Sequence, residues 1–113
     1  MAQKKYLPGN TVMMILKLLE GQDMYGHQLI VALAKRSDDA FNIKTGILYP
    51  LLHNLENDGY VSSYRAEVDD GKERKYYQIT TRGKEHLAKK WAEWLAYTES
   101  INAVMGMELH YAT

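Results

Sequence analysis

The chain has 113 residues, of which 46% are hydrophobic and 25% charged, and this is the balance of an ordinary single globular domain. Its 14 lysines and arginines equal its 14 aspartates and glutamates, so a nucleic-acid surface would have to arise from local clustering of cations. The lack of cysteine excludes disulfides and thiolate metal sites, and no apolar run approaches the ~20 residues of a membrane span, so we expect a soluble cytoplasmic protein without metal or cofactor.

Two amphipathic helices are predicted in the first third of the chain. The segment from about Asn10 to Glu20 begins with capping residues and carries apolar residues at helical spacing, and Gly21 can close it. The segment from Met24 to about Arg36 has the same spacing and is followed by a polar break. We therefore expect two helices of similar length before residue 37.

A third helix, predicted from about Thr45 to Asn57, differs from the others in its polar face. Ile47 and four leucines fall within one arc when the residues are plotted at ~100° each. The opposite arc is polar and aromatic but almost uncharged, and it carries Gly46, Tyr49, Pro50, His53 and Asn57, with Thr45 and Glu56 at its borders. Pro50 lies beyond the first turn if Thr45 is the cap, so it is expected to bend the helix or tighten its start.

A β-hairpin is predicted after the stop signal Asp58-Gly59. Residues rich in Val, Tyr, Ile and Ser run from Tyr60 to Val68 and again from Glu73 to Thr80, with Asp-Gly between them. Four cations lie near the turn: Arg65, Lys72, Arg74 and Lys75. They could reach phosphates, although acidic residues of the same hairpin weaken the local field, and the alternative is a solvated hairpin.

The last helix is predicted from Arg82 to near the C-terminus. Six residues alternate at spacings of four and three, as in a coiled-coil seam: Leu87, Trp91, Trp94, Thr98, Ile101 and Met105. A domain this small cannot cover so long a helix, so we expect it to pack on the same helix of a second copy. The expected homodimer interface consists of Leu87, Trp91, Trp94, Ile101 and Met105. The chain would then divide into a domain of residues 1–81 and a dimerisation helix of residues 82–113.

Three short helices followed by a hairpin are the order of a winged helix-turn-helix, so the expected fold class is mainly α with a small β-hairpin, that is, α+β. In such domains the third helix enters the major groove of double-stranded DNA and the hairpin lies along the backbone. We expect DNA contacts from Lys44, Thr45, Tyr49, His53, Arg65, Lys72, Arg74 and Lys75. Lys44 and Thr45 can serve both as helix cap and as phosphate anchor. The alternatives are packing on neighbouring residues for Tyr49 and plain solvent exposure for His53.

Several short motifs occur together at fixed distances. They are Tyr25-Gly26, residues 45–52 followed by Leu55-Glu56 and Gly59, Arg74-Lys75-Tyr76-Tyr77, and Thr80 with Gly83. At this spacing they resemble the PadR family of bacterial transcriptional regulators along nearly the whole chain. The resemblance implies a repressor that binds a palindromic operator through the third helix and the wing. It also implies a dimer formed by the C-terminal helix and release of DNA by a small apolar or phenolic compound.

The short tail resembles the compact branch of that family, which includes multidrug-sensing repressors that hold flat aromatic ligands between tryptophans. Trp94 matches the ligand-stacking position by its distance from Gly83, and Trp91 and Thr98 are further candidate effector contacts on the same helix. Offset stacking of indoles on a flat ligand would supply the affinity. The alternative is that both tryptophans are ordinary interface core.

The sequence also bears on two other classes of function, an enzyme and a protein-interaction module. Nothing resembles a phosphate loop, a nucleophile with its base or convergent carboxylates, so we expect no enzymatic activity and no metal site. A winged-helix protein-interaction module that does not bind DNA is the rival hypothesis, because the net charge is zero.

Overall fold

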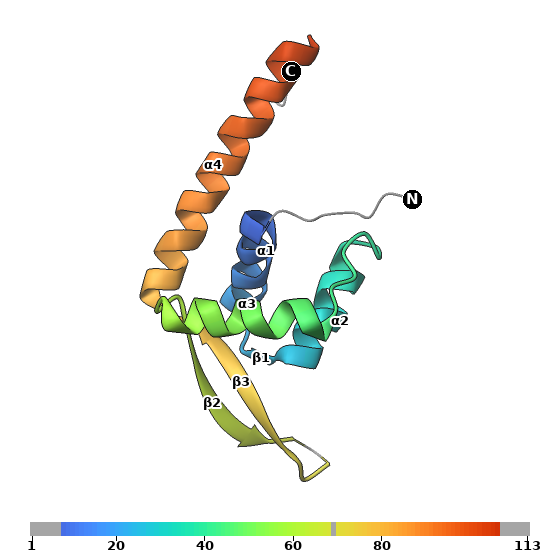
Figure 1. Ribbon diagram of the computed structural model, residues 1–113, viewed down its shortest axis with the longest axis vertical. Helices are drawn as coiled ribbons and strands as arrows, with labels where there is room; N and C mark the ends of the chain where they lie inside the picture. Colours follow the sequence, from blue (N-terminus) through green and yellow to red (C-terminus); the bar gives the residue numbers. More distant parts are fainter. Residues whose placement is uncertain (1–7, 69, 107–113) are drawn as a thin grey trace.

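The structure is a computed structural model that describes residues 8–68 and 70–106. Its elements are α1 (Pro8–Gly21), β1 (Met24–Tyr25), α2 (Gly26–Arg36), α3 (Thr45–Asn57), β2 (Val61–Glu67), β3 (Glu73–Ile79) and α4 (Thr81–Met105) (Figure 1). Within this part of the chain four helices accompany one small antiparallel sheet, which confirms the expected α+β fold class. Asp69 of the expected turn and residues 107–113 of the expected C-terminal segment lie outside the described residues.

The second helix begins two residues later than predicted, because Met24 and Tyr25 form a strand. This strand, β1, pairs antiparallel with β3, with Met24 opposite Tyr77 and Tyr25 opposite Tyr76, and the sheet has the order β1-β3-β2. The backbone N–H of Tyr25 donates a hydrogen bond of 3.1 Å to the Gln28 side chain, so the strand leads directly into the first turn of α2. A strand of two residues has no periodicity of its own, so the sequence carried no signal for it.

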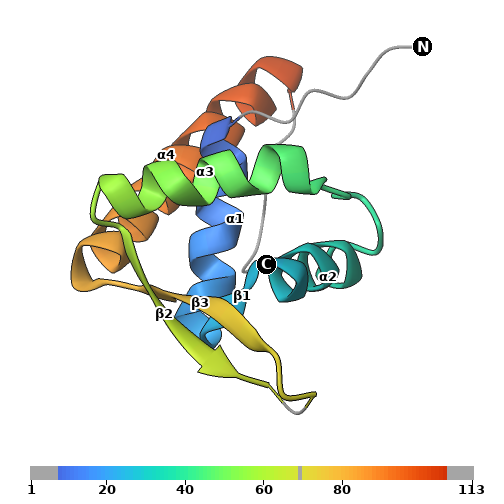
Figure 2. The same cartoon turned by 60° about the horizontal axis from the view of Figure 1, so that its bottom comes forward.

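The core forms around α1, which lies in the middle of the domain with α3 crossing it (Figure 2). The buried side chains are Ile15, Leu16, Leu18 and Leu19 of α1, Leu29 and Leu33 of α2, Leu48, Leu52 and Leu55 of α3, Val61 and Tyr77 of the sheet, and Leu87 of α4. Each helix thus buries one apolar stripe, as the 3.6-residue period requires. Ile47 is the exception, because it was predicted within the stripe of α3 and is 62% exposed.

The start of α3 also differs in detail from the prediction. Lys44 is the N-cap and Thr45 the first helical residue, and the Lys44 carbonyl accepts hydrogen bonds of 2.9 Å from the backbone N–H groups of Ile47 and Leu48. The helix continues through Pro50 to Asn57. Pro50 has no N–H to donate to the carbonyl four residues before it, so that turn holds one hydrogen bond fewer.

Two side-chain hydrogen bonds of Thr80 join the hairpin to the last helix. The Thr80 hydroxyl donates to the Gly59 carbonyl at 2.7 Å and accepts from the Gly83 N–H at 3.0 Å, which caps α4. A methyl group at Gly83 would collide with the backbone oxygen of Tyr60, so only glycine allows this close approach. From this joint, α4 packs on α1 and then projects away from the domain (Figure 1).

Candidate nucleic-acid interface

The outward face of α3 carries no charged side chain. The buried leucines hold the opposite side of the helix against the core, so the pitch of the helix turns a set of uncharged residues to solvent. This set, which we call the α3 face, consists of Gly46, Ile47, Pro50, His53, Asn54 and Asn57. Cations stand at both of its ends, with Lys44 exposed at the start of α3 and the hairpin beside its last turns.

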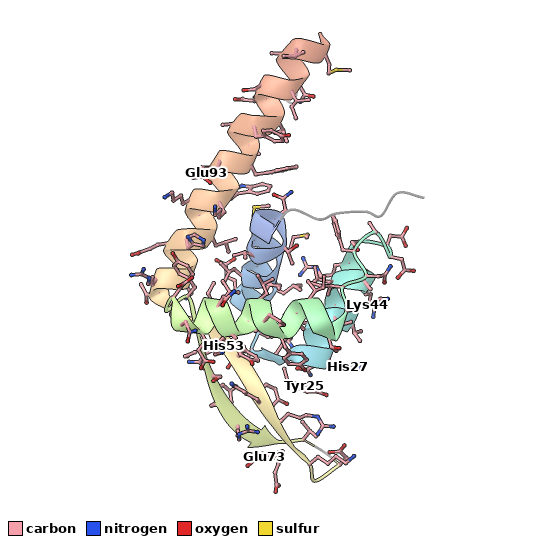
Figure 3. The ribbon with its side chains drawn as sticks, in the orientation of Figure 1. Tyr25, His27, Lys44, His53, Glu73 and Glu93 are labelled. Carbon is pink, nitrogen blue, oxygen red and sulfur yellow. The ribbon has the colours of Figure 1, made fainter. Side chains whose placement is uncertain are left out.

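Tyr49 lies at the border of the α3 face and touches α2. Its side chain is 45% exposed, and a methyl group at Gly26 would collide with its hydroxyl oxygen. The close contact with Gly26 means that Tyr49 packs on its neighbour and still keeps nearly half of its surface in solvent. Figure 3 shows Tyr25 and His27 at the start of α2 and His53 on α3, all on the side from which the hairpin extends.

His53 is exposed at the middle of the α3 face and has a partner on the same helix. The Asn57 amide nitrogen lies 3.2 Å from His53 Nε2, one turn away. This bond constrains both side chains, because an amide N–H donor requires the lone pair of that ring nitrogen. Asn54 has no side-chain hydrogen bond within residues 8–68 and 70–106, so its amide group is free.

The four hairpin cations do not converge on one surface. Arg65 lies opposite Lys75 in the register of β2 and β3, whereas Arg74 lies opposite Ala66. Successive residues of a strand point to opposite faces, so Arg65 and Lys75 share the face of Tyr77 and the core, and Arg74 lies on the other face. Lys72 precedes β3 in the turn. The hairpin therefore presents cations on both sides and at its tip.

Two of these cations are already paired. Lys75 Nζ lies 3.6 Å from Glu56 Oε1, and an Arg74 guanidinium nitrogen lies 3.6 Å from Asp70 Oδ2. Such half-exposed pairs contribute about 0–1 kcal/mol, so a phosphate can displace them. In the described part of the chain, Lys44, Lys72 and Arg65 have no ion pair, which leaves one such cation at the start of α3 and two on the hairpin.

Glu56 connects α3 to both strands of the hairpin, a role that the sequence did not indicate. Besides its contact with Lys75, its second carboxylate oxygen accepts a 2.5 Å hydrogen bond from the Ser63 hydroxyl. One side chain of α3 thus contacts both β2 and β3. Its place at the border of the polar arc of α3 was the only signal in the sequence.

A row of tyrosines crosses the outer face of the sheet and was also missed. Tyr76 packs edge-on against Tyr25, with ring centroids 5.3 Å apart, and stacks on Tyr64 at 5.6 Å. The Tyr64 hydroxyl donates to Asp23 at 2.7 Å, and the accepting carboxylate raises the pKa of Tyr64. Cross-strand aromatic pairs of this kind stabilise a sheet, so the row braces all three strands.

The predicted seam of α4 is split between two environments. Leu87 is 8% exposed and belongs to the core of its own subunit. Beyond it, Trp91, Ile101 and Met105 are exposed, and Trp94 is partly buried with its ring centroid 5.9 Å from that of Tyr97. Leu95, Tyr97 and Val104 extend the exposed apolar surface and were not predicted as part of it. We call these exposed or partly exposed side chains the α4 face: Trp91, Trp94, Leu95, Tyr97, Ile101, Val104 and Met105.

Thr98 lies on the same side of α4 as Trp91 and Trp94, and its hydroxyl donates to the Leu95 carbonyl at 2.9 Å.

Two other kinds of feature are absent from residues 8–68 and 70–106. None of their helices has the length and apolar character of a membrane span, and no three of their side chains form a group that could bind a metal ion.

Comparison with known proteins gives one consistent result. Residues 15–89 match the transcriptional regulator PadR-like family. The transcriptional regulator Rv3488 of Mycobacterium tuberculosis is 34% identical over 76 residues, which are 67% of each chain. Among solved structures, a transcriptional regulator from Clostridium thermocellum is 33% identical with a TM-score of 0.78, covering 84% of this chain and 92% of its own. A PadR family transcription regulator from Clostridium difficile is 30% identical with a TM-score of 0.72, covering 84% and 97%.

Proposed function

Because the chain belongs to the transcriptional regulator PadR-like family, and so to a class of DNA-binding regulators rather than enzymes, we propose that it is a cytoplasmic repressor that binds a palindromic operator as a homodimer. The observation that carries the proposal is the construction of α3. Its leucines at 48, 52 and 55 are buried, and its outward face is uncharged. Lys44 and Arg65 flank it and have no ion pair among residues 8–68 and 70–106. A helix that binds in the major groove contacts base edges with its outward side chains, while cations on either side of it bind the phosphates.

The proposed DNA contacts are the residues around this face. Lys44 and Thr45 would hold a phosphate at the start of α3, and Tyr49 and His53 would lie along the groove. Arg65, Lys72, Arg74 and Lys75 would bind the backbone from the hairpin. Arg74 and Lys75 would exchange a carboxylate partner for a phosphate, which the weakness of exposed ion pairs permits.

The α4 face supports the homodimer. It is too apolar and too continuous for a surface that stays in water, and an identical helix from a second copy is self-complementary to it. Two copies related by a twofold axis would present two α3 faces, which is why the operator would be a palindrome. Trp91, Trp94 and Thr98 would line the space between the two helices and hold a flat aromatic effector there.

The test of DNA binding is a titration of the protein against the DNA upstream of its own gene at several salt concentrations. A regulator that neutralises several phosphates loses affinity steeply, with log K falling by ~0.9 per unit of log salt for each phosphate. The rival winged-helix adaptor gives no retention of DNA even at low salt. Absence of retention would refute the proposal.

Replacement of Arg65 by glutamine is expected to reduce the salt slope by about 1.8, because a dimer contains two copies of each phosphate contact. Affinity should fall on operator and random DNA alike, because phosphate contacts carry no sequence information. The measurement is fluorescence anisotropy with labelled duplexes. Lys89→Gln, which removes an exposed cation of α4, is the control with an unchanged slope. An unchanged slope in Arg65→Gln contradicts the wing contact.

Planar aromatic compounds are expected to quench the tryptophan emission of the dimer, because stacking places the ligand in van der Waals contact with Trp94. Trp94→Phe should weaken ligand binding several-fold, and its remaining Trp91 still reports the titration. The parallel readout is release of operator DNA by the same compound. A flat response in both the natural protein and Trp94→Phe would reject the effector proposal while leaving DNA binding intact.

A further inference from the structure

We propose that α3 reads A·T base pairs, with Ile47 packing on the C5-methyl group of a thymine and Asn54 hydrogen-bonding the edge of an adenine. The inference rests on the proposed function and deepens it, because it names what the α3 face recognises. It starts from two side chains that the fold itself does not use: an exposed isoleucine and a free amide group.

Ile47 is the residue that makes this face unusual. It is 62% exposed on a helix whose leucines at 48, 52 and 55 are buried. It lies at the edge of the α3 face opposite to the edge where Tyr49 contacts Gly26 of α2. In the major groove the thymine C5-methyl is the apolar group that a side chain can meet. An exposed isoleucine on a major-groove helix therefore favours a thymine over the other three bases.

The rest of the α3 face excludes the commonest ways to read G·C pairs. Guanine is read by a bidentate arginine or lysine and cytosine by a carboxylate, and the face carries none of these groups. The carboxylate of Glu56 accepts the Ser63 hydroxyl and so stays directed at the hairpin when Lys75 exchanges it for a phosphate. Besides the His53 imidazole, whose Nε2 accepts the Asn57 amide, the remaining polar side chains of the face are amides, and a bidentate amide selects the N6 and N7 atoms of adenine.

Of the two asparagines on the face, Asn54 is the one free to make that bidentate pair. The Asn57 amide nitrogen is engaged by His53, whereas Asn54 has no side-chain partner in the described part of the chain. Ile47 and Asn54 are seven residues apart, two turns of one helix stripe, or about 10.5 Å. At ~3.4 Å per base pair along the duplex axis, the two contacts lie at most about three base pairs apart in each half-site.

The thymine contact is tested by atomic substitution in the DNA, with the full-length dimer and an operator fragment identified by the upstream titration. Each thymine is replaced in turn by deoxyuridine, which removes only the methyl group. One position per half-site is expected to weaken binding about fourfold, the effect of one buried methyl. The same replacement should have no effect on Ile47→Ala, whose affinity for the unmodified operator is already lowered. Val31→Ala, which trims another exposed β-branched side chain on α2, is the matched control and keeps the full deoxyuridine effect.

The adenine contact is tested in the same way with 7-deazaadenine, which lacks the N7 acceptor. One position within about three base pairs of the sensitive thymine should lose affinity roughly five- to tenfold with the natural protein, because one bond of the bidentate pair is lost, and show no further loss with Asn54→Ala. The inference is overturned if Ile47→Ala remains sensitive to deoxyuridine and Asn54→Ala to 7-deazaadenine. It is also overturned if no deoxyuridine or 7-deazaadenine replacement changes the affinity of the natural protein for the operator. In either result DNA is still bound with a steep salt dependence, whereas failure of the proposed function leaves no DNA binding at all.

Discussion

Replacing Ile101 with glutamate is expected to dissociate the homodimer and to lower operator affinity at least 100-fold. Ile101 lies within the α4 face and is 42% exposed in the single subunit, so a partner helix would cover it. A carboxylate there would be buried without a counterion, and such burial is strongly destabilising. A monomer can hold only one half-site, and loss of the linked second site reduces affinity by about 10²–10⁴.

Two measurements distinguish dissociation of the dimer from the loss of operator affinity that follows from it. Sedimentation gives the mass of the variant in solution, and anisotropy with the operator duplex gives its affinity. Ala96→Glu is the matched control, because Ala96 is exposed on the side of α4 away from Ile101 and Trp94, and it should remain dimeric with unchanged operator affinity. If Ile101→Glu were still a dimer, the α4 face would not be the interface, and the palindromic operator would lose its structural basis.

Replacing Gly83 with alanine is expected to reduce the free energy of unfolding by about 3 kcal/mol, the upper range for forcing a group into a packed site. The added methyl would collide with the backbone oxygen of Tyr60. That carbonyl cannot move aside freely, because it accepts the Thr80 N–H at 3.1 Å, and the Tyr60 N–H donates to the Leu55 carbonyl at 2.9 Å. The clash therefore acts on the joint between α3, the hairpin and α4.

Urea unfolding followed by circular dichroism measures this change. Gly21→Ala is the control, because a methyl at the last residue of α1 meets no atom within 4 Å. Its stability should be equal to that of the natural protein or higher by a few tenths of a kcal/mol, since alanine favours helix and restricts the unfolded chain. Equal stability of Gly83→Ala and the natural protein would show that the hairpin and α4 are not locked together at this point.

Most of the architecture could be predicted because each helix and strand follows from the local spacing of its apolar residues. The leucine stripe predicted α3 from Thr45 to Asn57, and the Asp-Gly turn between β-rich segments predicted the hairpin. The four-three spacing after Arg82 predicted α4. Each of these signals lies within one element, where the spacing of apolar residues determines which side chains share a face.

The candidate site was less predictable, because its geometry depends on contacts between elements distant in the chain. The strand β1 exists only because β3 lies beside it, and Tyr49 reaches Gly26 only because α2 and α3 pack together. The hairpin register places Arg74 and Lys75 on opposite faces, although they are neighbours in sequence.

The sequence by itself thus determined the order of helices and strands, the uncharged face of α3 and the apolar seam of α4. Only the tertiary structure decided that Leu87 belongs to the core of its own subunit, that Ile47 faces solvent, and that Glu56 holds the hairpin. The physical reason is that periodicity states which residues share one side of an element, whereas burial and pairing depend on which other element covers that side.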